Sequence, residues 1–187
     1  MEIKDKSLKE LETLSQEIRD RIIDVVSRKG GHFSSTLGAV ELTLGMHYVF
    51  DAYSDPFIFD VSHQCYPHKL LTGRWEEFET VRQFGGLSGF TKPKESPADY
   101  FVAGHSSTSI SLAVGAAKAI ALKKENRVPV VMIGDGSMTA GMVYEALNEL
   151  GDIKLPVVII LNDNEMSIAK RIGAISKHLS KLLAGKY

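Results

Sequence analysis

Two continuous apolar runs, at residues 129–133 and 156–161, constrain the fold of this 187-residue chain most strongly. Both are rich in valine and isoleucine, which favour β-strands. Residues 138–150, between them, have the composition and apolar spacing of a helix. Two strands that are joined through a helix by short connections lie parallel in one sheet. Because neither run alternates with polar residues, we expect helices on both faces of that sheet.

The rest of the sequence predicts more helices and one further strand. Residues 8–26 carry leucine, isoleucine and valine at three- and four-residue steps, which predicts an amphipathic helix that Ser7 and Glu10 cap and Gly30 ends. The other predicted segments are helices over 37–49, 66–84 (broken at Pro67 and Gly73) and 107–123, a strand over 57–61 and a loop over 85–98. We find no linker and no repeat, so residues 1–187 are predicted to form a single α/β domain.

Composition excludes several classes of protein. Lysine and arginine number 22 against 23 acidic residues, and no basic stripe is present, so we expect no nucleic-acid partner. The apolar runs are far shorter than a membrane span requires, so we expect no membrane association. The first residues lack the features of a signal or transit peptide, and Cys65 is the single cysteine. These features favour a bacterial cytoplasm.

A carboxylate and an amide follow the two runs that define the parallel unit. Asp135 comes directly after the first run and its glycine, and Asn164 comes shortly after the second. Carboxyl ends of parallel strands meet at one edge of a sheet, where ligands bind, so these two side chains are predicted to lie near each other. Their oxygens suit Mg²⁺ or Ca²⁺ better than zinc. Gly136 and Ser137 are predicted to open a helix whose amides favour an anion, so the layout predicts a metal that bridges the protein to a diphosphate.

Other sites are less well supported. A dinucleotide fingerprint and a phosphate-binding P-loop are both absent from the sequence. His63, Cys65 and His68 are an alternative zinc set, which their tight spacing, Pro67 and the lack of a second cysteine disfavour. His32 and His105 follow glycines in loops, and such histidines more often belong to a site than to a core. His47 and His178 are interpreted as ordinary residues, and Cys65 as a small buried one.

The combined pattern resembles that of the thiamine diphosphate enzymes, and within them the 1-deoxy-D-xylulose-5-phosphate synthase family. The resemblance covers about residues 18–187 and rests on five segments, 31–38, 63–69, 104–109, 134–137 and 162–168. It implies a three-layer thiamine diphosphate-binding fold with a mostly parallel central sheet. One departure is Ser62, which stands where the family usually has glycine.

The resemblance also implies a reaction and a set of site residues. Pyruvate would lose CO₂ and join D-glyceraldehyde 3-phosphate to give 1-deoxy-D-xylulose 5-phosphate, which feeds isoprenoid, thiamine and pyridoxal synthesis. Asp135, Asn164 and the carbonyl of Met166 would hold Mg²⁺. The residues expected to contact thiamine diphosphate are His63, Gly104, His105, Ser106, Gly136, Ser137 and Asn164. His32 and His63 would move protons or orient the substrate.

The family's enzymes are much longer, and their later domains carry the glutamate that activates the cofactor. We therefore expect this chain alone to be incomplete for catalysis, with the remaining part of the enzyme present in the same or another polypeptide, and the full enzyme to be a homodimer. Two alternatives remain open at this point, the N-terminal half of a split transketolase and a non-catalytic module that keeps the cofactor fold. The segment after about Ser167 is either a helix or an active-site loop.

Overall fold

A parallel sheet of three strands forms the centre of the described chain. The computed structural model describes residues 3–163 and the single positions 174, 181 and 185. Strand β2 (Val130–Gly134) lies between β1 (Phe57–Phe59) and β3 (Val158–Asn162), and both neighbours run parallel to it. The expected strand–helix–strand unit is therefore confirmed, with its crossover helix α6 (Gly141–Ile153) in place.

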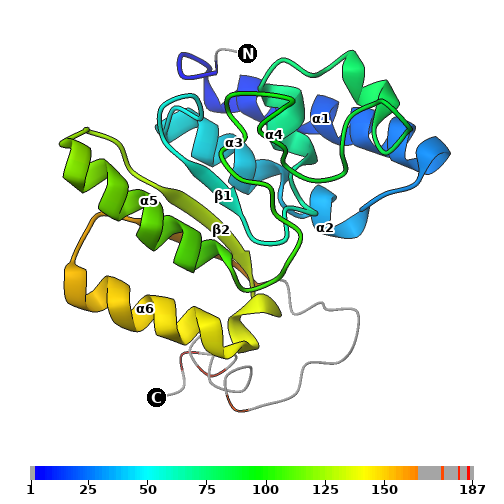
Figure 1. Ribbon diagram of the computed structural model, residues 1–187. Helices are drawn as coiled ribbons and strands as arrows, with labels where there is room; N and C mark the ends of the chain where they lie inside the picture. The colour runs from blue at the N-terminus through cyan, green and yellow to red at the C-terminus, as the bar shows by residue number, and fades with distance from the viewer. Residues whose placement is uncertain (1–2, 164–173, 175–180, 182–184, 186–187) are drawn as a thin grey trace.

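Helices cover both faces of the sheet, as the absence of polar alternation predicted (Figure 1). Helices α1 (Leu8–Lys29), α3 (Val40–Val49) and α4 (Tyr66–Leu71) lie on one face, and α5 (Ser109–Lys123) and α6 lie on the other. Alternate strand residues point to the two sides: Phe57, Phe59, Val130 and Met132 belong to the core with α1, α3 and α4, while Ile58, Val131 and Ile133 belong to the core with α5 and α6. The fold is the expected three-layer α/β arrangement.

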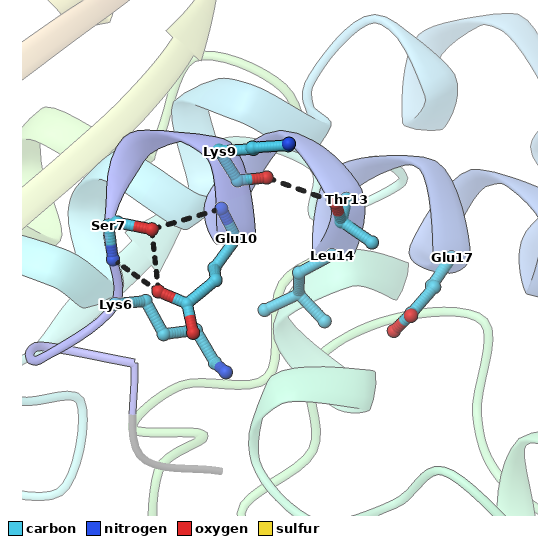
Figure 2. Close-up of a pocket in the computed structure, with 7 residues that line it drawn as sticks. All are labelled: Lys6, Ser7, Lys9, Glu10, Thr13, Leu14 and Glu17. Carbon is cyan, nitrogen blue, oxygen red and sulfur yellow. Dashed lines mark hydrogen bonds between the residues drawn. The ribbon is translucent and has the colours of Figure 1, made fainter.

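The first helix begins at the predicted cap. The Ser7 hydroxyl accepts the Glu10 backbone N–H at 3.4 Å, and the Glu10 carboxylate accepts the Ser7 N–H at 2.8 Å (Figure 2). This reciprocal pair satisfies two amides that the first turn would otherwise leave open. At the other end Gly30 adopts a φ of 78°, which an L-residue rarely adopts, so the helix ends at the expected glycine.

Three helix boundaries differ from the sequence-based expectation. The stretch 37–49 is divided between α2 (Ser34–Leu37) and α3, with Gly38 and Ala39 in a turn. Pro67 lies in the first turn of α4, where its missing N–H costs no helical hydrogen bond, so it begins that helix and does not break it. The short 3₁₀ helix η1 (Glu77–Thr80) is the only other helical part of the predicted 66–84 segment.

The third difference concerns the segment that follows β2. Gly136 and Ser137 were expected to open the crossover helix, but they open the short 3₁₀ helix η2 (Ser137–Thr139), and α6 begins only at Gly141. The expected helix N-terminus is therefore displaced by four residues from Ser137. The segment after Ser167, which was predicted as a helix or a loop, lies outside the described residues.

Buried charges hold the 85–98 loop against α4. Arg74 donates two hydrogen bonds to Asp99, at 2.8 and 2.9 Å, and Lys69 contacts Glu95 at 2.5 Å. One ring nitrogen of His68 forms a hydrogen bond with His47 at 2.9 Å, and the other forms a hydrogen bond with Asp99 at 3.0 Å. Burial alone would raise the pKa of the Asp99 carboxyl, but hydrogen bonds from His68 and Arg74 hold it well below its ordinary value.

These contacts argue against the alternative zinc set. Both ring nitrogens of His68 are already engaged, and across residues 3–163 we find no group of three or more histidine, cysteine, aspartate or glutamate side chains placed to hold a metal ion. Cys65 is buried as expected, and burial raises the pKa of its thiol to about 12, which keeps it protonated and unreactive. The described part of the chain also contains no helix that is long and apolar enough to cross a membrane.

Candidate functional site

Asp135 lies at the carboxyl edge of the sheet, one residue beyond β2. Its backbone N–H donates to the Asn162 carbonyl at the end of β3, at 3.3 Å, which continues the pairing of Gly134 with Asn162. The Asp135 side chain is 5% exposed. The two strands of the unit therefore end together, as predicted. Asn164 and Met166, the other expected metal ligands, lie outside the described residues.

Glycines leave open space beside the backbone in the two segments expected to contact the cofactor. We call residues 104–107 the Gly-His loop and residues 134–137 the Asp135 turn. A β-carbon added at Gly104, Gly134 or Gly136 would meet no atom within 4 Å. In the Gly-His loop the residues Gly104, His105 and Ser106 are exposed. Open backbone beside a buried carboxylate fits an incoming diphosphate with a hard divalent cation.

The Gly-His loop and the Asp135 turn are joined directly. The Ser107 hydroxyl donates a hydrogen bond of 2.8 Å to the Ser137 carbonyl. The Ser107 backbone N–H donates to Asp60 Oδ1 at 2.8 Å, and the Ser109 N–H donates to Asp60 Oδ2 at 3.2 Å. Asp60 is the residue that follows β1. The ends of β1 and β2 and the start of α5 therefore meet at one place, where the two joined segments carry the predicted site residues Gly104, His105, Ser106, Asp135, Gly136 and Ser137.

His32 and His63 form a second part of this edge. Their ring centroids are 5.9 Å apart, and Phe90 lies 5.2 Å from His32. The Nδ1 atoms of both histidines are buried and have no hydrogen-bond partner among the described residues. The Thr36 hydroxyl donates to the His63 carbonyl at 3.1 Å, which fastens α2 to the chain after β1.

Burial sets the protonation of this histidine pair. It lowers the pKa of His32, an effect to which Arg82 and His63 add, and it lowers the pKa of His63, where the Asp60 carboxylate opposes it. Both imidazoles are therefore neutral near pH 7. A neutral imidazole with an unpaired buried nitrogen is able to accept a proton or a hydrogen bond from a ligand.

The backbone around these residues is unusual. Val61, Ser62 and Ser107 have φ values of 60°, 64° and 70°, in the left-handed region that few residues other than glycine adopt. The Ser62 hydroxyl accepts the Thr91 N–H at 3.1 Å. Gly31, beside His32, has a φ of 150°, and a β-carbon there would lie 2.7 Å from the Tyr66 hydroxyl oxygen. Such conformations persist where the surrounding structure holds them, which is common at functional sites.

Asp60 and Ser107 were not among the predicted site residues. Their contacts join positions 47 and 49 residues apart, so no local spacing reveals them. The predicted strand over 57–61 also concealed Asp60, because the observed strand β1 ends at Phe59 and so places Asp60 at the carboxyl edge of the sheet, as Asp135 is after β2. The hollow beside the α1 cap in Figure 2, lined by residues such as Lys6, Thr13 and Glu17, contains none of the predicted site residues.

Known proteins resemble this chain over its whole length. The family described as 1-deoxy-D-xylulose-5-phosphate synthase matches residues 1–187. The synthases of Aliarcobacter butzleri and Nitratiruptor sp. are 91% and 75% identical over 187 residues, which is 100% of this chain and 31% of each relative. That of Campylobacter hominis is 70% identical over the same share. The chain thus spans about a third of the length of these relatives.

A solved structure has the same fold at low sequence identity. Transketolase from Leishmania mexicana aligns with a TM-score of 0.76 and 21% identity, over 94% of this chain and 31% of that one. The split-transketolase alternative is therefore supported by similarity of fold alone. The synthase relatives, in contrast, match the sequence of this chain over all 187 residues. The chain belongs to the 1-deoxy-D-xylulose-5-phosphate synthase family.

Proposed function

We propose that this chain is the N-terminal thiamine diphosphate- and Mg²⁺-binding domain of a 1-deoxy-D-xylulose-5-phosphate synthase. The observation that carries the proposal is the hydrogen bond from Ser107 to the Ser137 carbonyl, which joins the Gly-His loop to the Asp135 turn at the sheet edge. The open glycines and the buried Asp135 carboxylate suit a diphosphate and a hard cation. Membership of the family over residues 1–187 supports the same conclusion.

In this proposal each predicted residue has one role. Asp135, Asn164 and the Met166 carbonyl hold the cation, and Gly136, Ser137 and Asn164 contact the diphosphate end of the cofactor. His63 and the residues Gly104, His105 and Ser106 line the rest of the cofactor. When bound, thiamine diphosphate supplies a nucleophilic carbon and a ring that accepts the electron pair released with CO₂.

His32 and His63 handle protons beside the reacting carbon. Because burial keeps both rings neutral, either is able to take a proton from the substrate and return it. The edge-on packing of the two rings and the contact with Phe90 restrict their orientation. Pyruvate loses CO₂, and the remaining two carbons join D-glyceraldehyde 3-phosphate to give 1-deoxy-D-xylulose 5-phosphate.

The complete enzyme contains more polypeptide than this chain. The relatives are about three times as long, so we propose that the remaining part completes the site and that the enzyme acts in the cytoplasm as a homodimer. The 187-residue chain alone should show no turnover.

Release of labelled CO₂ tests the reaction. The complete enzyme should release CO₂ from carboxyl-labelled pyruvate only when D-glyceraldehyde 3-phosphate, thiamine diphosphate and Mg²⁺ are all present. A ketol transfer between sugar phosphates without CO₂ would identify a transketolase instead. Failure of the complete enzyme to bind thiamine diphosphate would identify a module that keeps the fold without the cofactor.

A further inference from the structure

The Asp60 carboxylate is a buried charge that the proposed reaction does not use. It is 1% exposed, and its two oxygens accept the backbone N–H groups of Ser107 and Ser109. Ser109 is the first residue of α5, while Thr108, at the cap position of that helix, makes no side-chain capping bond. Asp60 thus supplies, from the end of β1, the acceptor that the helix lacks locally, where the helix dipole favours a negative charge.

Asp60 also holds a conformation that would not persist on its own. Ser107 has a φ of 70°, which is unfavourable for a serine, and its N–H and hydroxyl both have fixed partners, Asp60 and Ser137. Residues in such conformations need contacts that over-determine them. One carboxylate therefore connects the end of β1, the Gly-His loop and, through Ser107, the Asp135 turn.

We propose that Asp60 is a positioning residue for the cofactor: it fixes the Gly-His loop, through Ser107, against the Asp135 turn before the cofactor arrives. This inference rests on the proposed function, because the loop and the turn are the segments assigned to thiamine diphosphate. Pre-organisation lowers the cost of ordering a site upon binding, so its loss weakens affinity more than it weakens the chemistry of the loaded enzyme.

The chain offers a matched control for Asp60. Asp55 also accepts two backbone N–H groups, from Asp51 at 3.1 Å and Val128 at 2.9 Å, but it lies before β1, at the opposite end of the strand. The experiment measures the dissociation constant of thiamine diphosphate at saturating Mg²⁺, by calorimetry, in the complete enzyme with Asp60→Asn or Asp55→Asn. Thermal unfolding without cofactor is measured in parallel.

Asp60→Asn should raise the dissociation constant about tenfold or more, because one N–H loses a charged acceptor. Asp55→Asn, at a less buried carboxylate, should lower the unfolding temperature by a smaller amount and leave the dissociation constant within about twofold. At saturating cofactor the turnover of Asp60→Asn should stay closer to wild type than its affinity does. Equal effects of the two variants on affinity, or no effect of Asp60→Asn, would overturn the proposal.

Ser107→Ala gives a second and independent measurement. It removes the bond to Ser137 but leaves the Asp60 charge, which also acts on His63, in place. It should weaken cofactor binding, and in the double variant the two effects should combine to less than their product. The control is Ser96→Ala, which removes another buried serine hydroxyl, one that accepts the Ala98 N–H, away from the site. If Asp60→Asn does not fold, an unchanged affinity in Ser107→Ala overturns the proposal.

The outcomes separate this inference from the proposed function. A wild-type complete enzyme that does not bind thiamine diphosphate contradicts the proposed function itself. A wild-type enzyme that binds it, with Asp60→Asn and Ser107→Ala both unchanged in affinity, contradicts only the role of Asp60.

Discussion

Ser62 has an unfavourable backbone conformation, and its side chain stabilises the segment beside the candidate site. Its φ of 64° is a conformation that suits glycine, yet its hydroxyl gives the buried Thr91 N–H an acceptor. Serine at this position therefore adopts an unfavourable backbone conformation, and in return it forms a hydrogen bond between the end of β1 and the 85–98 loop. A glycine at this position would keep the conformation without that bond.

This exchange predicts an order of stabilities. Ser62→Ala keeps the unfavourable φ and removes the acceptor, so it should lower the free energy of unfolding by about 1–3 kcal/mol. Ser62→Gly loses the same bond but relieves the left-handed strain, so it should be more stable than Ser62→Ala by about 1 kcal/mol. Urea denaturation of the three proteins measures both differences. Alanine as stable as glycine would contradict the strain.

One buried histidine, His68, and three partly buried ones give the stability a pH dependence. Burial lowers the pKa values of His32, His47, His63 and His68, and it is the largest cause for each. In the unfolded chain these groups titrate near pH ~6.5, so below that pH the unfolded state binds more protons than the folded state. Their contribution to stability is therefore fully present above that pH and is lost as the pH falls.

The measurement is urea denaturation between neutral and mildly acidic pH, above the range in which carboxylates titrate. The free energy of unfolding should decrease steadily as the pH falls below about 6.5. His47→Gln should reduce the slope, because one such group is removed. A stability that does not change over this range would show that the four rings do not stay neutral in the folded protein.

At the scale of elements, the 85–98 loop depends on α4. Lys69 is completely buried, with Glu95 at 2.5 Å and Asp99 at 3.9 Å from its ammonium nitrogen. A buried pair is costly to break, because the partner that remains is an uncompensated charge. The loop includes Phe90, which contacts His32, so α4 indirectly supports the candidate site.

A comparison of two lysine–glutamate pairs tests this dependence. Lys69→Met should lower the free energy of unfolding by about 3–5 kcal/mol, because Glu95 loses its close buried cation, while Asp99 keeps its bonds to Arg74. Lys118→Met removes an exposed lysine that pairs with Glu149 between α5 and α6, and it should cost at most about 1 kcal/mol. Thermal or urea unfolding of both variants measures the two losses of free energy of unfolding. Similar losses would mean that burial does not strengthen the Lys69 pair.

Elements were predictable where their signals are local. The apolar runs of β2 and β3 and the cap of α1 depend on neighbouring residues, and each is found where the sequence placed it. The turn at Gly38 and the place of Pro67 in the first turn of α4 were not predicted. Glycine and proline each occur at more than one kind of helix boundary, so the residue type alone does not tell whether a helix begins, ends or is interrupted there. The later start of α6 was not predicted either, because the packing of the Asp135 turn before it cannot be derived from the local sequence.

At the scale of the whole molecule, parallel topology made part of the site predictable. Knowing that β2 and its neighbours end at one edge is enough to bring Asp135 and the His63 segment to the same side. The contacts of Asp60 with Ser107 and Ser109 were not predictable, because they join distant segments whose approach depends on how α5 packs on the sheet. Strand β3 remains partly exposed although four of its five residues are apolar.

Cofactor affinity after substitution of Asp135 tests the central claim most directly. Thiamine diphosphate is titrated calorimetrically, with Mg²⁺, into the complete enzyme as wild type, Asp135→Asn and Asp152→Asn. Asp152 is an exposed aspartate near the end of α6, so it controls for the change in charge. Wild type and Asp152→Asn should bind alike, while Asp135→Asn should lose measurable binding and keep its folded circular dichroism spectrum. Unchanged affinity in a folded Asp135→Asn would contradict the account.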